Sequence, residues 1–473
     1  MRVITRTSML ALLFSALLAQ VAVASADDRL IAAARSDDAV KVRALLKAGT
    51  KADSAQGDGA TALHWAAHWD NVPMAEALLA AGAKADVAND LGVTPLWLAC
   101  LNGNEALAGR LLKAGADPNR ALPSGETPLM VASRTGAVPV VKLLLARGAN
   151  VNAREVAKSQ TALMWAVSEE HPDAVRVLIE GGADLTARTA VRKRRVNTDA
   201  AGFGAGVVMD VEQGGFTALL FAARQGDVAS ARLLLDRGAS PNDAAPDGTT
   251  ALVVASHSGH GALASLLLDK GANPNAAAAG YSALHLAIVR SDTELVRALL
   301  AKGADPNAIV ERGTGMRRSS PDYALESPMI GAPPLWLAAR LAQPEVMRLL
   351  KASGAKAIGP SKDGTPLVVA AAQGTRRVEP GFTRDLADDE RRISESVELA
   401  LGLGADINSV NKDGNTALHI AAQRRMKDVI RLLAGKGAAV RQKNTKGQTP
   451  LGLVSRDAAG ESVAQMLRDL GAE

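Results

Sequence analysis

The chain has 473 residues and a formal net charge of +5, and 48% of its residues are hydrophobic although only 3% are aromatic. This length ordinarily corresponds to about two to four domains, and the single cysteine, Cys100, excludes an intrachain disulfide. A core with so few large rings must be built from alanine, leucine and valine, which suits thin and closely stacked helices.

The segment 1–26 has the layout of a secretory signal peptide. Two arginines precede an almost wholly apolar stretch, 9–23, and the small residues 24–26 form a cleavage site that two aspartates follow. An uncleaved membrane anchor is the alternative, but the apolar stretch is short for a span of roughly 20 residues. We therefore expect cleavage after Ala26 and a periplasmic or secreted protein with no membrane span after cleavage.

From residue 27 onward the sequence repeats a unit of about 33 residues. A glycine follows a leucine-rich stretch in each unit, as at Gly49, Gly82, Gly115 and Gly148. In phase with these glycines runs a second marker, which is usually Thr-Ala-Leu or Thr-Pro-Leu. Its copies begin at Thr61, Thr94, Thr127, Thr161, Thr217, Thr250, Ser282, Pro333, Thr365, Thr416 and Thr449.

Each unit predicts a pair of short helices. In one copy, Thr127 caps a helix that continues through 129–133, because a threonine side chain satisfies free N–H groups at a helix start. A second helix follows over 140–145, and Gly148 ends it in the left-handed conformation that glycine adopts without strain. Neither helix is long enough to be stable alone, so each must bury its apolar face against its neighbours.

The turn and exit residues of these units resemble the ankyrin-repeat family. Examples are the Thr-Pro-Leu and Thr-Ala-Leu-His turns and the exits Gly-Ala-Asp-Pro-Asn at 115–119 and 303–307. The resemblance implies an all-α ankyrin-repeat solenoid of about 12 helix-turn-helix repeats with β-turn tips. The chain departs from the family at the turn histidine, which only His64, His285 and His419 keep. We expect the usual histidine hydrogen bond to be missing from the other turns.

The phase of the repeats divides the chain into segments. Ankyrin-like repeats occupy 57–187, 214–309 and 332–446, and capping repeats occupy 27–56 and 447–473. Three insertions interrupt the period, at 188–213, 310–331 and 375–392. The first contains four consecutive basic residues, 192–195, and a glycine-rich run, 202–206, a composition that favours a disordered loop.

The sequence predicts no catalytic residue, cofactor or metal site. His64 and His68 have a spacing that can hold zinc, but no third ligand is evident, and His64 occupies the structural position of the family. The glycine-rich run 202–206 lacks the strand and the Gly-Lys-Ser/Thr ending of a phosphate loop. Cys100 falls at a small packed position, which favours an inert buried thiol. We therefore expect that the protein is not an enzyme.

In ankyrin-repeat proteins, partners usually contact the concave surface made by the turn tips and the first helices. Arginine occurs in six of the eleven residue pairs that the family places there, and the alternative interpretation is that these arginines only solvate helix ends. Trp69 is the best single candidate for an exposed binding residue. The predicted partner-binding residues are His68, Trp69, Asn102, Arg134, Arg224, His257, Arg290, Arg340 and Arg424.

Three functions follow from this interpretation, in decreasing order of support. The first is a monomeric protein–protein interaction scaffold that binds an acidic protein partner in the groove. The second is a binding protein for an anionic glycan or envelope polymer. The third is an enzyme that uses groups on an insertion. We expect no nucleic-acid partner, because the net charge is small and aromatic residues are sparse.

Overall fold

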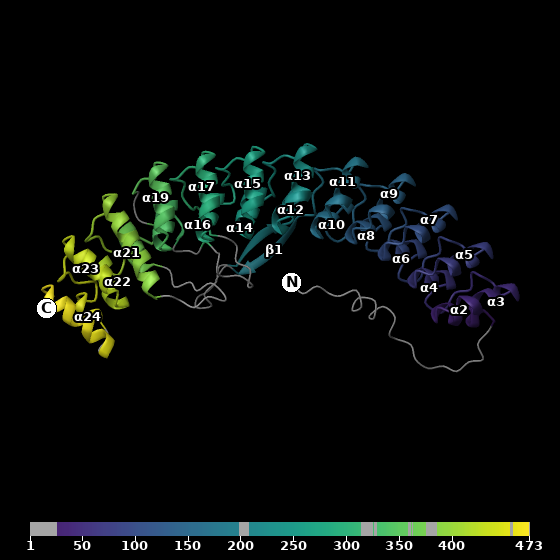
Figure 1. Ribbon diagram of the computed structural model, residues 1–473, viewed down its shortest axis with the longest axis horizontal. Helices are drawn as coiled ribbons and strands as arrows, with labels where there is room; N and C mark the ends of the chain where they lie inside the picture. Colours follow the sequence, from purple (N-terminus) through teal and green to yellow (C-terminus); the bar gives the residue numbers. More distant parts are fainter. Residues whose placement is uncertain are drawn as a thin grey trace. The chain divides into compact units, whose positions relative to one another are not determined.

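The computed structural model describes residues 26–197, 208–313, 325, 329–357, 361, 363–374, 386–454 and 457–472. Two compact units divide the chain, Met1–Val156 and Ala157–Glu473, here called unit 1 and unit 2. Figure 1 shows their helices and strands in chain order. Each unit is a stack of short helix pairs, which confirms the predicted all-α repeat fold. The predicted signal peptide lies almost entirely outside the described residues, as does most of the insertion predicted at 310–331.

Unit 1 contains helix pairs in which a first helix is followed by a turn and a second helix. The first helices contact one another along the stack, and so do the second helices. The pairs are α2 (Ala26–Arg35) with α3 (Ala39–Lys47), α4 (Ala62–His68) with α5 (Val72–Ala80), α6 (Pro95–Asn102) with α7 (Glu105–Lys113), and α8 (Pro128–Arg134) with α9 (Val138–Ala146).

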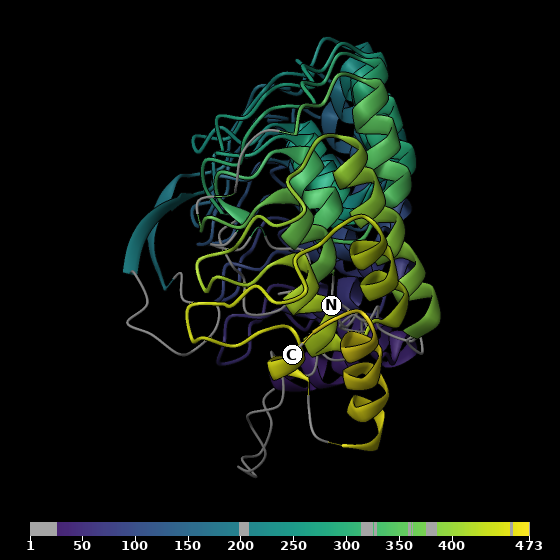
Figure 2. The same cartoon turned by 90° about the vertical axis from the view of Figure 1, so that its left-hand side faces the viewer.

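Unit 2 repeats this arrangement and adds a two-stranded antiparallel sheet. In Figure 2 its turns lie to the left and its second helices to the right. Its elements are α10 (Ala162–Ser168), α11 (Pro172–Glu180), β1 (Arg192–Asn197), β2 (Val208–Gln213), α12 (Ala218–Gln225), α13 (Val228–Asp236), α14 (Ala251–Ser258), α15 (Gly261–Asp269), α16 (Ala283–Val289), α17 (Thr293–Ala301), α18 (Pro334–Arg340), α19 (Pro344–Ala352), α20 (Leu367–Gln373), α21 (Leu386–Gly402), α22 (Ala417–Arg424), α23 (Lys427–Gly435), the 3₁₀ helix η3 (Leu451–Leu453) and α24 (Ala458–Asp469).

Local sequence explains where these helices begin and end. At α6 the hydroxyl of Thr94 accepts a hydrogen bond from the backbone N–H of Trp97 at 3.1 Å, and Pro95 occupies the first turn, where its missing N–H costs nothing. Gly103 ends the helix with a φ of 73°. The threonine cap and the left-handed glycine recur at α14, at Thr250 and Gly259, without the proline.

The core lies between the two helix layers of each repeat. In α6 every residue from 95 to 100 is buried, because the first helices are covered on both sides by neighbouring repeats. In α7 only one face is buried, with Leu107 and Leu111 inside and Arg110 exposed. The difference explains why the first helices are nearly all apolar while the second helices are amphipathic.

Each of the three turn histidines, His64, His285 and His419, forms hydrogen bonds within its own turn and to the following turn. The backbone N–H of Thr61 donates to His64 Nδ1, and His64 Nε2 donates to the Val93 carbonyl, both at 3.0 Å. His285 and His419 make the corresponding bonds. These side chains are therefore structural, as the sequence suggested for His64.

The expectation that this bond is missing wherever the histidine is replaced is wrong at Trp336. Trp336 is 2% exposed, and its indole Nε1 donates to the Thr365 carbonyl at 2.9 Å. Trp97 occupies the equivalent position of α6, but its buried Nε1 has no hydrogen-bond partner in the described part of the chain. An indole can thus replace the imidazole donor, and whether it does so depends on the neighbouring turn.

Replacing Trp336 with phenylalanine is expected to lower the free energy of unfolding more than the matched change Trp97→Phe. Both changes remove a similar volume, but only the first deletes a hydrogen bond and leaves a carbonyl unsatisfied. The expected difference is about 1–2 kcal/mol. Urea denaturation followed by circular dichroism would measure it, and equal losses in the two variants would contradict the role given to the indole N–H.

The described parts of the first insertion include two paired strands, so the expectation of a disordered loop is wrong for these residues. Strands β1 and β2 pair in the register Arg192↔Gln213 through Asn197↔Val208, which places Lys193 opposite Glu212 and Arg195 opposite Asp210. Opposite charges on paired strands favour this register. The expectation of disorder rested on the basic and glycine-rich runs and missed the acidic residues of the partner strand. The glycine-rich run 202–206 lies outside the described residues.

Two further segments differ from their predicted boundaries. The insertion predicted at 375–392 ends earlier, because 386–392 already belongs to α21, where Arg391 pairs with Asp388 and Glu395 at helical spacing. In the last repeat, η3 replaces the first helix, and Gly452 within it has little tendency to form a helix. The second helix, α24, is present and exposes Gln465, as expected of a capping repeat.

Candidate partner-binding surface

The predicted binding residues lie at the C-terminal ends of the first helices. They occupy two positions of the repeat, which we name by counting from the capping residue at the start of each first helix. The seventh position holds His68, Arg134, Arg224, His257 and Arg340, and the eighth position holds Trp69, Asn102, Arg290 and Arg424.

At the eighth position, side chains repeatedly bind the preceding repeat. Each donates to the backbone carbonyl of the seventh-position residue, or its equivalent, one repeat earlier. The bonds are Trp69 Nε1 to Arg35 O at 3.1 Å, Asn102 Nδ2 to His68 O at 3.2 Å, Gln225 Nε2 to Ser168 O at 2.8 Å, and Arg290 Nη1 to His257 O at 2.9 Å. For Arg290, the interpretation that arginine satisfies a helix end therefore describes the contact.

A glycine makes room for this contact in the middle of unit 2. Gly259 has a φ of 82°, and a Cβ added to it would lie 2.3 Å from Arg290 Nη2. The guanidinium thus lies directly against the backbone at the end of α14. Arg290 thereby joins two consecutive repeats by satisfying a carbonyl at the end of α14.

In unit 1 the candidate residues form two local groups. His68 lies edge-on between Trp65 and Trp69, with ring centroids 5.7 and 4.7 Å apart, and Trp69 is 47% exposed. Partial burial lowers the pKa of His68, and the nearby Asp70 carboxylate partly offsets this shift. In the second group, Arg134 forms an ion pair with Glu126 at 3.5 Å.

Arg224 in unit 2 is an exposed arginine positioned by two aromatic rings. Its Cζ lies 4.8 Å from the centroid of Phe221 and 5.9 Å from that of Phe216. The two rings pack edge to face at 5.9 Å. Such contacts restrict the motion of the guanidinium. The backbone carbonyl of Arg224 contacts His260 Nε2 at 3.2 Å.

The remaining candidates of unit 2 are placed differently. His257 is exposed at the end of α14. Arg340 and Arg424 are half-buried and meet at Gly374: Arg340 Nη1 donates to its carbonyl, and Arg424 lies beside its Cα. Arg224 and His257 are thus exposed, whereas Arg340 and Arg424 make contacts inside the stack.

Sequence reasoning missed the aromatic support of Arg224. Phe221 precedes Arg224 by three residues on α12, and side chains at that helical spacing are neighbours. Phe216 lies just before the capping Thr217, at a position where most other units carry small or polar residues, although one has Tyr281 and another Val93. The contact with Phe221 could have been predicted from helical spacing. The contact with Phe216 depends on how the turn folds.

Other chemistry-bearing residues have structural surroundings. Both ring nitrogens of His64 make hydrogen bonds within the fold, so the His64–His68 spacing does not provide a pair of free metal ligands. Complete burial raises the pKa of the Cys100 thiol, so the reactive thiolate is disfavoured. Across the described ranges, no His, Cys, Asp and Glu side chains gather in a group able to hold a metal, and no helix is long and apolar enough to cross a bilayer.

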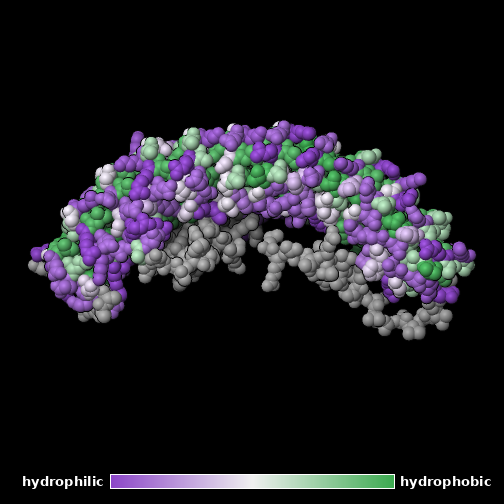
Figure 3. All heavy atoms as spheres, in the orientation of Figure 1, coloured by the Kyte–Doolittle hydropathy of each residue, from purple (hydrophilic) through white to green (hydrophobic). Residues whose placement is uncertain are grey.

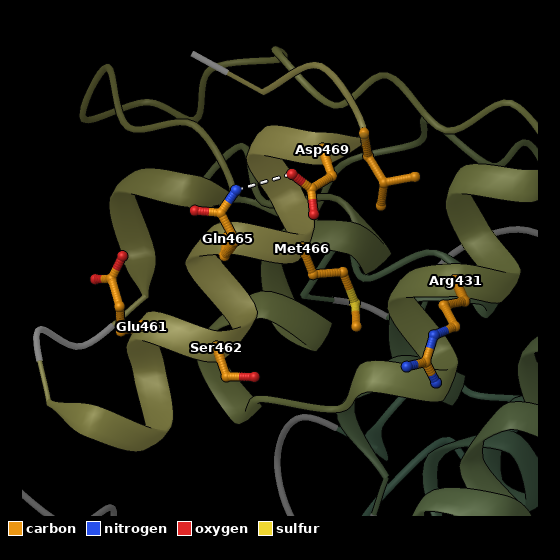
Figure 4. A pocket seen from close by; sticks show the side chains of 7 residues that line it. Arg431, Glu461, Ser462, Gln465, Met466 and Asp469 are labelled. Atoms are coloured by element: carbon orange, nitrogen blue, oxygen red, sulfur yellow. Dashed lines mark hydrogen bonds between the residues drawn. The ribbon is translucent and has the colours of Figure 1, made fainter.

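A pocket lies between the last two second helices, α23 and α24 (Figure 4). Arg431 approaches it from α23, and Met466 points into it from α24, with Ser462 and Glu461 along the same helix. Gln465 donates to Asp469 at 2.8 Å across one turn of α24. Among the residues that line the pocket, no nucleophile lies beside a base.

The face of the molecule seen in Figure 3 mixes hydrophilic residues with scattered hydrophobic ones. The most exposed large apolar side chains in the described ranges include Val40 and Val156 at 73% and Leu91 at 51%. They lie on separate repeats. Single exposed apolar side chains are normal on proteins, so specific contacts are better sought at the positioned polar residues.

Comparison with known proteins identifies the repeats. The family described as "Ankyrin repeats (3 copies)" matches residues 30–121, 110–189, 219–309 and 389–473, well over half of the chain. Solved structures that match number 550 chains, among them the crystal structure of the human ASB11 ankyrin repeat domain, which is 26% identical with a TM-score of 0.42 and covers 52% of this chain and 98% of its own. The comparison with curated proteins finds no match. Ankyrin repeats generally mediate protein–protein interactions and are typically non-catalytic, and this chain belongs to the ankyrin-repeat family.

Proposed function

We propose that this protein is a non-catalytic scaffold that binds an acidic protein partner across the seventh-position surface of unit 2. The observation that carries the proposal is the exposed guanidinium of Arg224, which Phe216 and Phe221 hold in place. An arginine that is already ordered loses little conformational freedom on binding, and such residues often dominate the binding energy of an interface.

The residue types along this surface support an acidic partner. The seventh position in unit 2 carries no acidic residue from α10 to α22. Its occupants are Ser168, Arg224, His257, Val289, Arg340, Ala372 and Gln423, of which Val289 and Ala372 are buried. A surface of basic and neutral residues favours encounter with an acidic one, and added salt screens exposed charges of this kind.

Charge reversal at Arg224 tests the proposal. In affinity capture from the exported fraction, Arg224→Glu is expected to weaken partner binding by about tenfold or more, because a favourable contact becomes a repulsion. Lys351→Glu, an equal charge change at an exposed position of α19, serves as the matched control and is expected to retain the partner. Equal capture by both variants, or salt-independent capture, would contradict an acidic partner at this surface.

Treating the extract before capture distinguishes a protein partner from an anionic glycan. Protease treatment removes a protein partner and glycan depletion leaves it, so the opposite result would favour the glycan. The exported compartment is part of the proposal and is supported by the segment 1–26. Mass spectrometry of the purified native protein is expected to find a chain that begins at Asp27.

A further inference from the structure

We propose that the open edge of β1 binds an extended acidic peptide segment of a partner protein by strand addition. The ribbon of β1 and β2 is a two-stranded sheet, so each of its strands has one edge that no described strand pairs. Such an edge offers backbone N–H and C=O groups to an added strand, and the side chains of the edge strand select which strand is added. This inference goes beyond the scaffold function, because it concerns the ribbon and not the helix ends.

The ribbon is held at its base, so its strands have a defined starting point. The backbone N–H of Thr189 donates to Phe216 O at 3.0 Å, and that of Gly215 donates to Thr189 O at 3.1 Å. Ala190 N–H donates to Lys158 O of the preceding turn at 2.7 Å. Gly214, with a φ of 114°, approaches Ala190 so closely that an added Cβ would lie 2.0 Å from its carbonyl oxygen.

Arg188 fixes the other side of the base. Its Nη1 donates to Gly215 O at 2.8 Å and to Ala244 O of the following repeat at 2.9 Å, and its Nη2 forms an ion pair with Asp243. Beyond this base the strands extend past the turns of the neighbouring repeats, as Figure 2 shows to the left of unit 2. An added strand would therefore meet a ribbon that is anchored and accessible.

The charges on β1 determine the kind of strand that fits. Arg192, Lys193 and Arg195 are exposed. On its paired edge, β1 already accepts an acidic strand, because the register sets Lys193 opposite Glu212 and Arg195 opposite Asp210. An acidic segment on the second edge would repeat that complementarity, since oppositely charged cross-strand neighbours stabilise a sheet.

The same charges disfavour self-association, in which a second copy of the ribbon would pair with the open edge of β1. Two β1 strands paired edge to edge would bring two runs of four basic residues, 192–195, against each other. Like charges in cross-strand positions destabilise pairing, and charged edge strands are a general protection against self-association. The edge is therefore open to an acidic partner and closed to another basic strand.

Fluorescence anisotropy with defined peptides tests the inference on the full-length protein. The probe is a fluorescein-labelled ten-residue peptide of alternating glutamate and valine. A peptide of alternating glutamate and proline has the same charge, but half of its residues have no backbone N–H and have φ fixed near about −65°, which disfavours an added strand. We expect the first peptide to bind at least about tenfold more tightly than the second, and hydrogen exchange to slow in 192–197 only with the first.

The protein variant Lys193→Thr/Arg195→Thr removes two charges but keeps residues that favour strands. It is expected to bind the glutamate–valine peptide about tenfold more weakly, whereas the control Lys351→Thr/Lys356→Thr, which removes two exposed lysines of unit 2, is expected to bind it normally. Equal binding of the two peptides, or equal binding by both variants, would overturn strand addition at β1.

The outcome also separates this inference from the scaffold function. Arg224→Glu is expected to leave the peptide affinity unchanged, because Arg224 lies on α12 and not on the ribbon. If Arg224→Glu abolishes peptide binding while the ribbon variant does not, acidic segments bind the helix ends, and the ribbon inference is wrong while the scaffold function gains support. If the ribbon binds the peptide but Arg224→Glu retains the captured partner, the ribbon inference is supported and the scaffold surface at Arg224 is wrong.

Discussion

Replacing His285 with leucine is expected to lower the free energy of unfolding by roughly 2–4 kcal/mol. His285 is fully buried at the start of α16. Its Nδ1 accepts from the Ser282 backbone N–H at 3.0 Å, and its Nε2 donates to Ala308 O at 2.9 Å. Leucine fills most of the space but leaves the buried N–H of Ser282 and the half-buried carbonyl of Ala308 without their partner. Calorimetry or urea denaturation would measure the loss.

His257→Leu is the matched control for this change. His257 is exposed at the other end of a first helix, α14, so its replacement is expected to cost less than about 0.5 kcal/mol. If the two variants unfold at the same denaturant concentration, the hydrogen bonds of His285 do not stabilise the stack as argued. Hydrogen exchange would add a local measure, because the turns joined by His285 should open first in the leucine variant.

The stability of unit 2 is expected to fall as the pH drops from 6.5 toward 4. Burial lowers the pKa of His285 from 6.5 to about 4, although its hydrogen bond to Ala308 and the charge of Asp305 act in the opposite direction. Between these two values the unfolded chain takes up a proton that the native imidazole refuses, so acid favours unfolding. For this one residue the loss at pH 5 is roughly 2 kcal/mol relative to neutral pH, and it levels off below pH 4.

Thermal unfolding of the wild type and of His285→Leu across pH 7 to 4 isolates this contribution. The variant lacks the titrating imidazole, so its unfolding temperature should decline less steeply between pH 6.5 and 4. Burial also lowers the pKa of His64 and His419, and these residues give both proteins a shared background slope. Parallel pH profiles for the two proteins would contradict the lowered native-state pKa of His285.

The candidate surface shows how far residue patterns carry a binding prediction. The spacing of the repeats identified the helix ends where Arg224 and Arg290 lie, because every unit folds in the same way. The spacing did not show that the seventh and eighth positions make different contacts. Only the stacked repeats show that Arg290 donates to the His257 carbonyl, whereas Arg224 is held by the rings of Phe216 and Phe221. The difference arises from contacts between repeats, which no single unit encodes.

By itself the sequence determined the repeating helix pair, since capping residues such as Thr94 and Thr250 and leucine-rich second helices are local signals whose physical effects act within one unit. Tertiary structure decided what depends on residues distant in the chain. The basic run 192–195 lies in a strand that is paired with the strand containing acidic residues 210 and 212. Trp336 takes the place of the turn histidine, and its indole donates to the Thr365 carbonyl. Cross-strand and inter-turn bonds form only after chain segments meet, so their partners have no fixed sequence spacing.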